Sequence, residues 1–293
     1  MEILQKLVPI VMLVFVVSSM LAMGLGLTVA QIIAPLRNVR LVLLSLLANF
    51  VLMPLAAIAL ARLLRLDEAL GVGLLLLGAA AGAPFLPKLT QIAKGNLAFA
   101  VGVMVLLMVI TVGYLPLVLP PLLPGVSVDS ARIARSLFLL MLLPLAGALA
   151  VKAKFPAPAA RAQPLLNKVS SISLILVILL LSVVNFNSVL SVFGTRGMLA
   201  ALLFVAAGFV IGWILGGPAV DTRPVLGLGT AQRNIAAALV VGSQSFSDPK
   251  VVVMVVVGAL VGLLILIPLS RALAKRSQDL PDGIGAMNSG SKK

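Results

Sequence analysis

Long apolar runs alternate along the chain with short breaks that carry charges, prolines or glycines. The runs are continuous and rich in Leu, Val and Ala, which is typical of membrane helices and unlike the alternating strands of a membrane β-barrel. At roughly 20 apolar residues per crossing, the pattern predicts nine transmembrane spans. They lie near residues 7–33, 41–61, 70–93, 97–119, 136–151, 168–190, 198–216, 224–245 and 250–272.

The composition excludes a water-soluble fold. Of 293 residues, 61% are hydrophobic and 10% are charged, whereas soluble domains carry about 25% charged residues. We therefore predict an all-α polytopic membrane protein, with residues 1–273 as a single membrane domain. Residues 274–293 lack an apolar period and predict a flexible cytoplasmic tail.

The excess of positive charge indicates how the protein is oriented in the membrane, and it does not indicate a nucleic-acid partner. Lys and Arg number 22 and Asp and Glu number 8, and such an excess is typical of the cytoplasmic loops of membrane proteins. Nine spans place the termini on opposite sides, and the C-terminal side holds more of the cationic residues. The sequence thus predicts a multi-pass protein of the plasma membrane, a bacterial inner membrane, with the N-terminus outside and the C-terminus in the cytoplasm.

Enzymatic chemistry is not expected from this chain. It has no cysteine and no histidine, which excludes thiol redox chemistry and metal sites built on those ligands. The eight acidic residues fall at span ends, in loops or in the tail, so no carboxylate pair lies inside the membrane. No nucleotide-type phosphate-binding loop is present. We expect no cofactor and no resident metal, and ATP-driven transport is excluded within this chain.

Two cationic residues, Lys88 and Arg233, lie inside otherwise apolar spans. A cation at the bilayer centre costs roughly 3 kcal/mol on insertion scales, so such residues normally face a cavity or a partner. Neither has an acidic neighbour in the sequence. Both are therefore candidate contacts for an anionic substrate.

Helix-breaking residues accompany both cations. Pro84 and Pro87 interrupt the third span, and Gly227 and Gly229 interrupt the eighth. Paired interruptions are typical of inverted-repeat transporters, in which two discontinuous helices cross near the midplane. The positive N-terminal ends of the half-helices would add to the attraction for an anion. The alternative is that the breaks only kink packed helices while the cations reach the interface.

Polar residues near the two breaks, or buried in mid-span, complete the candidate substrate-binding or coupling site. They are Gln232, Asn234, Thr230, Thr90, Gln91 and Asn49.

The segment from Pro84 to Ala93-Lys94-Gly95-Asn96, together with the later Gly229-Thr230-Ala231-Gln232-Arg233-Asn234, resembles the bile acid:sodium symporter family. The resemblance runs over most of residues 7–272. It implies a core of residues 41–119 and 198–272 and a flanking panel of residues 7–33 and 134–190, with the substrate between them. It also implies a small organic anion as substrate, carried with sodium.

The sodium ligands implied by the resemblance are largely missing. Gapless matching puts them at Leu86, Pro87, Met104, Leu107, Met108 and Leu228, which offer no hard oxygen ligands in their side chains. Gln232 remains as a weak sodium candidate. We therefore hypothesise that Lys88 and Arg233 replace the bound sodium ions. A desolvated lysine can also load and release a proton, so sodium and a proton are the candidate coupling ions, and uncoupled transport stays open.

The sequence thus favours a secondary active transporter of an organic anion that works by alternating access in the lipid bilayer. A passive anion channel, with the two cations forming a selectivity ring, is the main alternative. A structural or sensory membrane subunit is a third possibility.

Overall fold

The computed structural model describes residues 2–123, 129–187, 192, 196–217, 219 and 221–278. Within these ranges the regular secondary structure is entirely helical. Eight helices, counting the interrupted eighth span as one, are long and apolar enough to cross a membrane, and the shorter α5 belongs to a further interrupted span. The predicted all-α polytopic membrane fold is confirmed.

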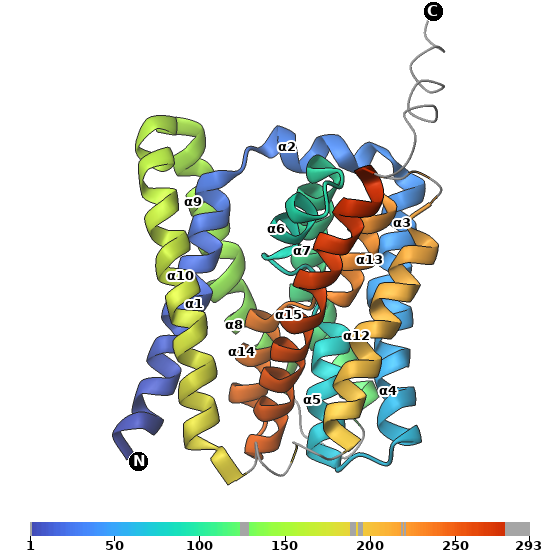
Figure 1. The fold of residues 1–293 in the computed structure, drawn as a ribbon. Helices are drawn as coiled ribbons and strands as arrows, with labels where there is room; N and C mark the ends of the chain where they lie inside the picture. Colours follow the sequence, from blue (N-terminus) through green and yellow to red (C-terminus); the bar gives the residue numbers. More distant parts are fainter. Residues whose placement is uncertain are drawn as a thin grey trace, which may run out of the picture.

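Four helices form one side of the bundle, at the left of Figure 1, and we call them the panel. They are α1 (Glu2–Gly26), α8 (Ser130–Leu137), α9 (Leu143–Lys154) and α10 (Pro156–Val184). Helix α1 packs along both α9 and α10. A π-helical turn, Phe138–Leu142, joins α8 to α9.

The remaining spans form a second group, which we call the core. It comprises α3 (Val39–Leu47), α4 (Met53–Leu63), α5 (Glu68–Ala79), α6 (Leu86–Ile92), α7 (Leu97–Leu122), α12 (Arg196–Leu215), α13 (Arg223–Ala231), α14 (Ile235–Ser245) and α15 (Pro249–Gln278). The short helix α2 (Val29–Ile33) and a 3-10 turn (Ala34–Arg37) run from the panel to the core across one end of the bundle (Figure 1).

The described chain begins and finishes at opposite ends of the bundle (Figure 1). We call the end where α1 begins the N-terminal end, and the end where α15 finishes the C-terminal end.

Three predicted boundaries were wrong. The first span ends at Gly26, because Thr28 caps a separate helix in which its side chain and that of Gln31 bond each other's backbone N–H. Helix α10 begins at Pro156 rather than near residue 168, so it is about three turns longer than predicted. Helix α15 runs to Gln278, beyond the predicted end of the last span near residue 272. Residues 279–293 of the predicted tail lie outside the described residues.

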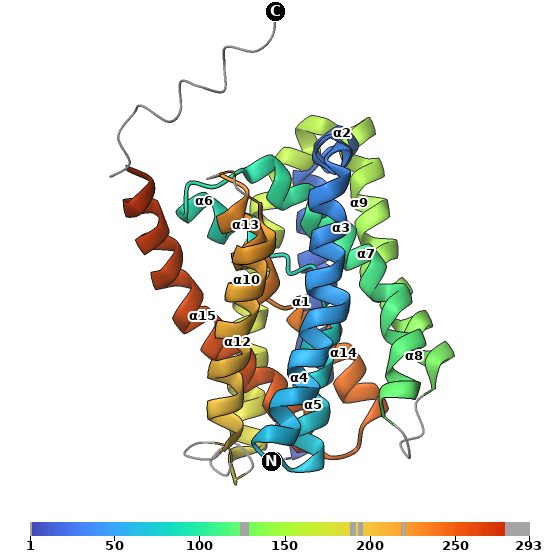
Figure 2. The same ribbon diagram turned by 90° about the vertical axis from the view of Figure 1, so that its right-hand side faces the viewer.

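Two spans are interrupted, and the two run in opposite directions. Helices α5 and α14 lie in the N-terminal half of the bundle, and α6 and α13 lie in the C-terminal half, in both Figures 1 and 2. The chain between α5 and α6 (residues 80–85) and between α13 and α14 (residues 232–234) is not helical. The C-terminal ends of α5 and α13 therefore point at each other near the middle of the core.

Asparagine and aspartate side chains fix where several core helices begin. The side-chain oxygen Oδ1 of Asn96 accepts a hydrogen bond from the N–H of Phe99 at 2.9 Å at the start of α7. Asp67 accepts the N–H of Ala69 at 3.1 Å at the start of α5. Such caps satisfy N–H groups that have no partner within the helix.

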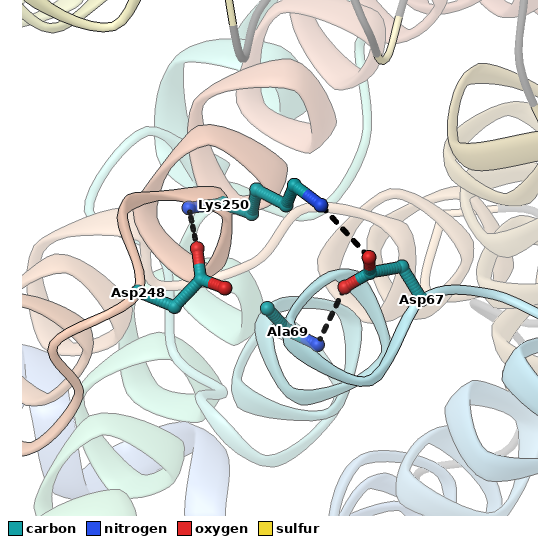
Figure 3. Close-up of polar contacts among 4 residues, drawn as sticks. All are labelled: Asp67, Ala69, Asp248 and Lys250. Atoms are coloured by element: carbon teal, nitrogen blue, oxygen red, sulfur yellow. Dashed lines mark hydrogen bonds and ion pairs between the residues drawn. The ribbon is translucent and has the colours of Figure 1, made fainter.

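The cap of α5 also ties it to α15 at the N-terminal end of the bundle (Figure 3). Lys250 Nζ donates to Asp67 Oδ2 at 2.8 Å, and the Lys250 N–H donates to Asp248 Oδ1 at 2.8 Å. The hydrogen bond from Lys250 lowers the pKa of the Asp67 carboxyl below its usual value. Asp67 thus belongs to the core and not to the candidate site.

We expect Asp67→Asn to lower the Tm slightly at neutral pH, because Asn still caps the helix but loses the charge that pairs with Lys250. The folded-state pKa of Asp67 lies below its unfolded value. Its contribution is therefore present above the unfolded pKa and is lost as the pH falls through the folded one. Melting curves should show the difference between variant and wild type shrinking below about pH 4. An undiminished difference at pH 3 would contradict this assignment.

Candidate functional site

The two breaks contact each other directly through Asn234. Its backbone N–H donates to Ala80 O at 2.9 Å, and its Nδ2 donates to Gly82 O at 3.1 Å. Its Oδ1 accepts the N–H of Ala237 at 3.1 Å and so caps α14. One fully buried side chain therefore starts the second half-helix and holds the break of the other span.

The Arg233 guanidinium lies between the ends of α5 and α13. Its Nε donates to Leu77 O at 2.8 Å and its Nη2 to Gly78 O at 2.7 Å. Its Nη1 donates to Asn49 Oδ1 at 2.6 Å and to Thr230 O at 3.1 Å. The residue is 5% exposed. Four of its five N–H groups thus donate to protein oxygens.

Backbone dipoles balance the charge of Arg233. Leu77 and Gly78 lie in the last turn of α5, and Thr230 lies in the last turn of α13. A helix C-terminus carries roughly half a negative charge, so two of them offset about one guanidinium. Among the described residues no carboxylate pairs with Arg233. The arginine therefore neutralises carbonyl groups that the two breaks leave without helical donors.

Asn49 and Thr230 complete this network. Asn49 is fully buried in a π-helical turn, Ala48–Leu52, that precedes Pro54. A proline cannot donate to the preceding turn, and the wider π-helical turn accommodates that loss. Asn49 Nδ2 donates to Thr230 Oγ1 at 3.3 Å. The structure thus brings together three predicted site residues from two spans, Arg233 and Thr230 of the interrupted eighth span and Asn49 of the second.

Thr111 of α7 contacts the place where the two breaks meet, which we call the crossing. Sequence reasoning missed this residue. Its Oγ1 accepts the N–H of Ala81 at 3.0 Å and donates to Ala81 O at 3.1 Å. The hydroxyl therefore satisfies both backbone groups of a residue in the first break. A threonine inside an apolar span carries no signal that distinguishes it from other interhelical hydroxyls.

The structure separates Lys88 from Arg233. Lys88 and Gln91 are exposed on α6, three residues apart and so on one face of the helix. Thr90 faces inward, is fully buried, and its Oγ1 has no hydrogen-bond partner among the described residues. The two cations therefore differ in their surroundings. Arg233 is hydrogen-bonded inside the core, and Lys88 is exposed at the surface of the core.

Three of the four predicted helix breakers lie inside helices. Pro84 is in the first break, but Pro87 is the second residue of α6, where a missing N–H costs nothing. Gly227 and Gly229 lie within α13. A Cβ on Gly229 would come within 2.9 Å of Leu86 Cδ2. These glycines thus serve close packing, and the breaks fall at residues 80–85 and 232–234.

Gln232 begins the second break and faces a small cavity. The cavity measures about 10 Å³ and is lined by Gln232, Arg233, Phe204, Gly258 and Gly262 among others. Gln232 is 4% exposed. The volume is close to that needed for one water molecule.

The six positions that the family resemblance assigns to sodium ligands are apolar, and all but Pro87, which is half-buried, are buried. Leu86, Met104, Leu107, Met108 and Leu228 all belong to the hydrophobic core. Their side chains carry no oxygen, and hard cations such as sodium require oxygen ligands. Gln232 and backbone carbonyls are what remain, and Arg233 already binds three of those carbonyls.

The Lys94-Gly95-Asn96 motif lies at the C-terminal end and connects two core spans. Lys94 adopts a left-handed conformation with φ 56°. Asn96 donates its N–H to Asp221 O at 3.0 Å and its Nδ2 to Asp221 Oδ2 at 2.9 Å. A groove of about 310 Å³ lies beside this contact, away from the crossing. The motif is thus a structural link between α6, α7 and the start of α13.

Comparison with known proteins gives one finding. The sequence profile of the sodium bile acid symporter family matches residues 11–192, which is more than half of the chain. No curated protein matches the chain significantly.

Proposed function

The chain belongs to the sodium bile acid symporter family, and on that premise we propose that it is a secondary active transporter of a small organic anion. It works by alternating access, with the panel and the core moving relative to each other. The membership itself supports a transporter and not an enzyme. We place the protein in a bacterial inner membrane with its N-terminus outside.

The observation that carries the proposal is the position of Arg233. A carrier that binds sodium holds the ion with oxygen atoms where broken helices cross. Here the oxygens of Leu77, Gly78 and Asn49 all accept hydrogen bonds from Arg233. The positive charge that sodium would bring is therefore part of the chain. We propose that this carrier does not require sodium, and a proton is the remaining candidate coupling ion.

Lys88 is the proposed substrate contact. Helix α6 packs against α7, α13 and α15, all of the core, and leaves Lys88 and Gln91 exposed. An ammonium group that the core leaves exposed part-way across a membrane bundle attracts a negatively charged group, because a cation inside a membrane span is costly unless it has a partner. The charge of Arg233 is already balanced, so the substrate pairs with Lys88.

Uptake into proteoliposomes tests the proposal. We expect accumulation of a labelled organic anion, such as taurocholate or a member of a panel of carboxylates and sulfonates chosen by thermal shift, at equal rates in sodium and choline buffers. Saturable uptake with countertransport indicates a carrier, whereas ohmic currents indicate a channel. Strict dependence on sodium would disprove the proposed role of Arg233.

Lys88→Gln should reduce binding of the anion at least tenfold without loss of folding, because the side chain is exposed and makes no hydrogen bond among the described residues. Thermal shift with the anion found above measures the binding. Lys154→Gln is the matched control, since Lys154 is also exposed but lies in the last turn of α9 in the panel. Equal binding by both variants would remove Lys88 from the site.

A further inference from the structure

The panel and the core are hydrogen-bonded to each other through the last turns of α14. Ser136 Oγ of α8 donates to Gln244 Oε1 of α14 at 2.5 Å. Ser243 Oγ, the preceding residue of α14, lies 3.6 Å from Met12 Sδ of α1. Helices α8 and α14 occupy the N-terminal half of the bundle in both Figures 1 and 2. The panel is thus joined to the core there by polar contacts as well as by packing.

The half-helix α6, in the C-terminal half of the bundle, makes different contacts from α14. Helix α14 packs against α1 and α8 of the panel, whereas α6 packs against α7, α13 and α15 of the core. Lys88 and Gln91 of α6 are exposed, but α14 is buried from Ile235 to Gly242. The described state therefore has the core closed against the panel in the N-terminal half.

Helix α14 connects this contact to the crossing. Its first turn is capped by Asn234, which also binds Ala80 O and Gly82 O of the first break. Gln244 lies ten residues after that cap, about 15 Å along the helix. A displacement of the crossing is therefore transmitted along one regular helix to the contact with Ser136.

We propose that Gln244 and Ser136 form the gate of the N-terminal end, which must separate in each transport cycle; this inference rests on the proposed transport function. A single neutral hydrogen bond suits such a gate. It raises the ratio of closed to open molecules about fivefold, and it is weak enough to break and form again in every cycle.

Cross-linking gives the direct test, and the chain has no cysteine of its own. The double variant Ser136→Cys with Gln244→Cys is bridged with a short bifunctional methanethiosulfonate in proteoliposomes. We expect uptake of taurocholate, or of another anion that the wild type carries, to fall at least tenfold, and dithiothreitol to restore it. Each single variant should keep its uptake when treated with the same reagent.

The matched control is a pair at the same end of the bundle that lies within the core. Lys250 Nζ and Asp67 Oδ2 are 2.8 Å apart on α15 and at the start of α5. Bridging Asp67→Cys with Lys250→Cys should leave uptake unchanged, because the two helices move together. Full uptake by the bridged Ser136 and Gln244 pair would overturn the gate. Absence of uptake by the wild type and the reduced variants would instead count against the proposed function.

A second measurement needs no substrate. Ile133 of α8 is 2% exposed, one turn before Leu137, on a helix that packs against α7 and α14 of the core. We expect a membrane-impermeant maleimide to modify Ile133→Cys about five times faster when Ser136→Ala is added, because the gate opens more often. Ser171→Ala is the control, since Ser171 is exposed and, among the described residues, its hydroxyl donates within α10, to Asn167 O. An unchanged rate with Ser136→Ala would also overturn the gate.

Discussion

Replacing Arg233 with alanine is expected to destabilise the protein by about 3–5 kcal/mol, because it leaves several buried oxygen atoms without donors. Three of these atoms are backbone carbonyls at the ends of α5 and α13, and the fourth is Asn49 Oδ1. Lysine should rescue only part of the loss, since one ammonium group cannot reach four acceptors arranged around a planar guanidinium. The measurement is the Tm of the purified protein.

The same variant tests whether the arginine stands in for sodium. Without the side chain, the four oxygen atoms surround an empty space of the kind that hard cations occupy. We expect the Tm of Arg233→Ala to be higher in sodium chloride than in choline chloride, and the Tm of the wild type to be the same in both.

Arg196→Ala is the control, because Arg196 is an exposed arginine that donates to one backbone carbonyl, Leu64 O, at 3.3 Å. It should lose little stability and show no response to sodium. A wild-type Tm that rises with sodium as much as that of Arg233→Ala would refute the substitution of arginine for the ion.

Gly82→Ala is expected to have the second large effect. Gly82 has φ +79°, and a Cβ there would lie 2.2 Å from Met108 N and 2.7 Å from Met104 O. Both are backbone atoms of α7, so no side chain can move aside, and the left-handed conformation adds a further cost. The break would have to shift and lose the bond from Asn234 to Gly82 O. We expect little monodisperse protein and a much lower Tm.

Gly113→Ala is the matched control for this prediction. Gly113 lies in α7, the helix that Gly82 touches, and a Cβ there would meet nothing within 4 Å. Alanine is a better helix former than glycine by about 1 kcal/mol, so this variant should be as stable as the wild type or slightly more so. Identical melting of the two alanine variants would show that the close approach of Gly82 to α7 is not required.

The sequence predicts the membrane fold and the two interrupted spans well, because apolar length and proline or polar interruptions are local properties of the chain. It locates the breaks only in part: Pro84 lies in the first break, whereas Pro87, Gly227 and Gly229 lie inside helices. The glycines Gly227 and Gly229 predict a helix break, but α13 continues through them. They lie where Phe209 and Leu86 pack closely against the helix. The breaks are instead set by contacts between distant segments, such as Asn234 with Gly82.

The candidate site is predicted in part for the same reason. An unpaired arginine in a membrane span indicates a buried partner, but its acceptors Leu77 and Gly78 lie more than 150 residues away and present only backbone oxygens. No side-chain pattern marks them. The difference between Lys88 and Arg233 is also invisible in the sequence, since it depends on which face of a short half-helix each one occupies. The roles of both residues in transport stay predictions.

A counter-charge that is covalently attached cannot dissociate on the far side of the membrane. Under the proposed function, Arg233 returns with the protein in every cycle and carries no energy in from an ion gradient. The net charge moved is then that of the substrate, and an inside-negative potential of 100 mV opposes entry of a monovalent anion by about 2.3 kcal/mol. Unless protons or a second anion move as well, such a carrier runs outward, and voltage becomes its driving force.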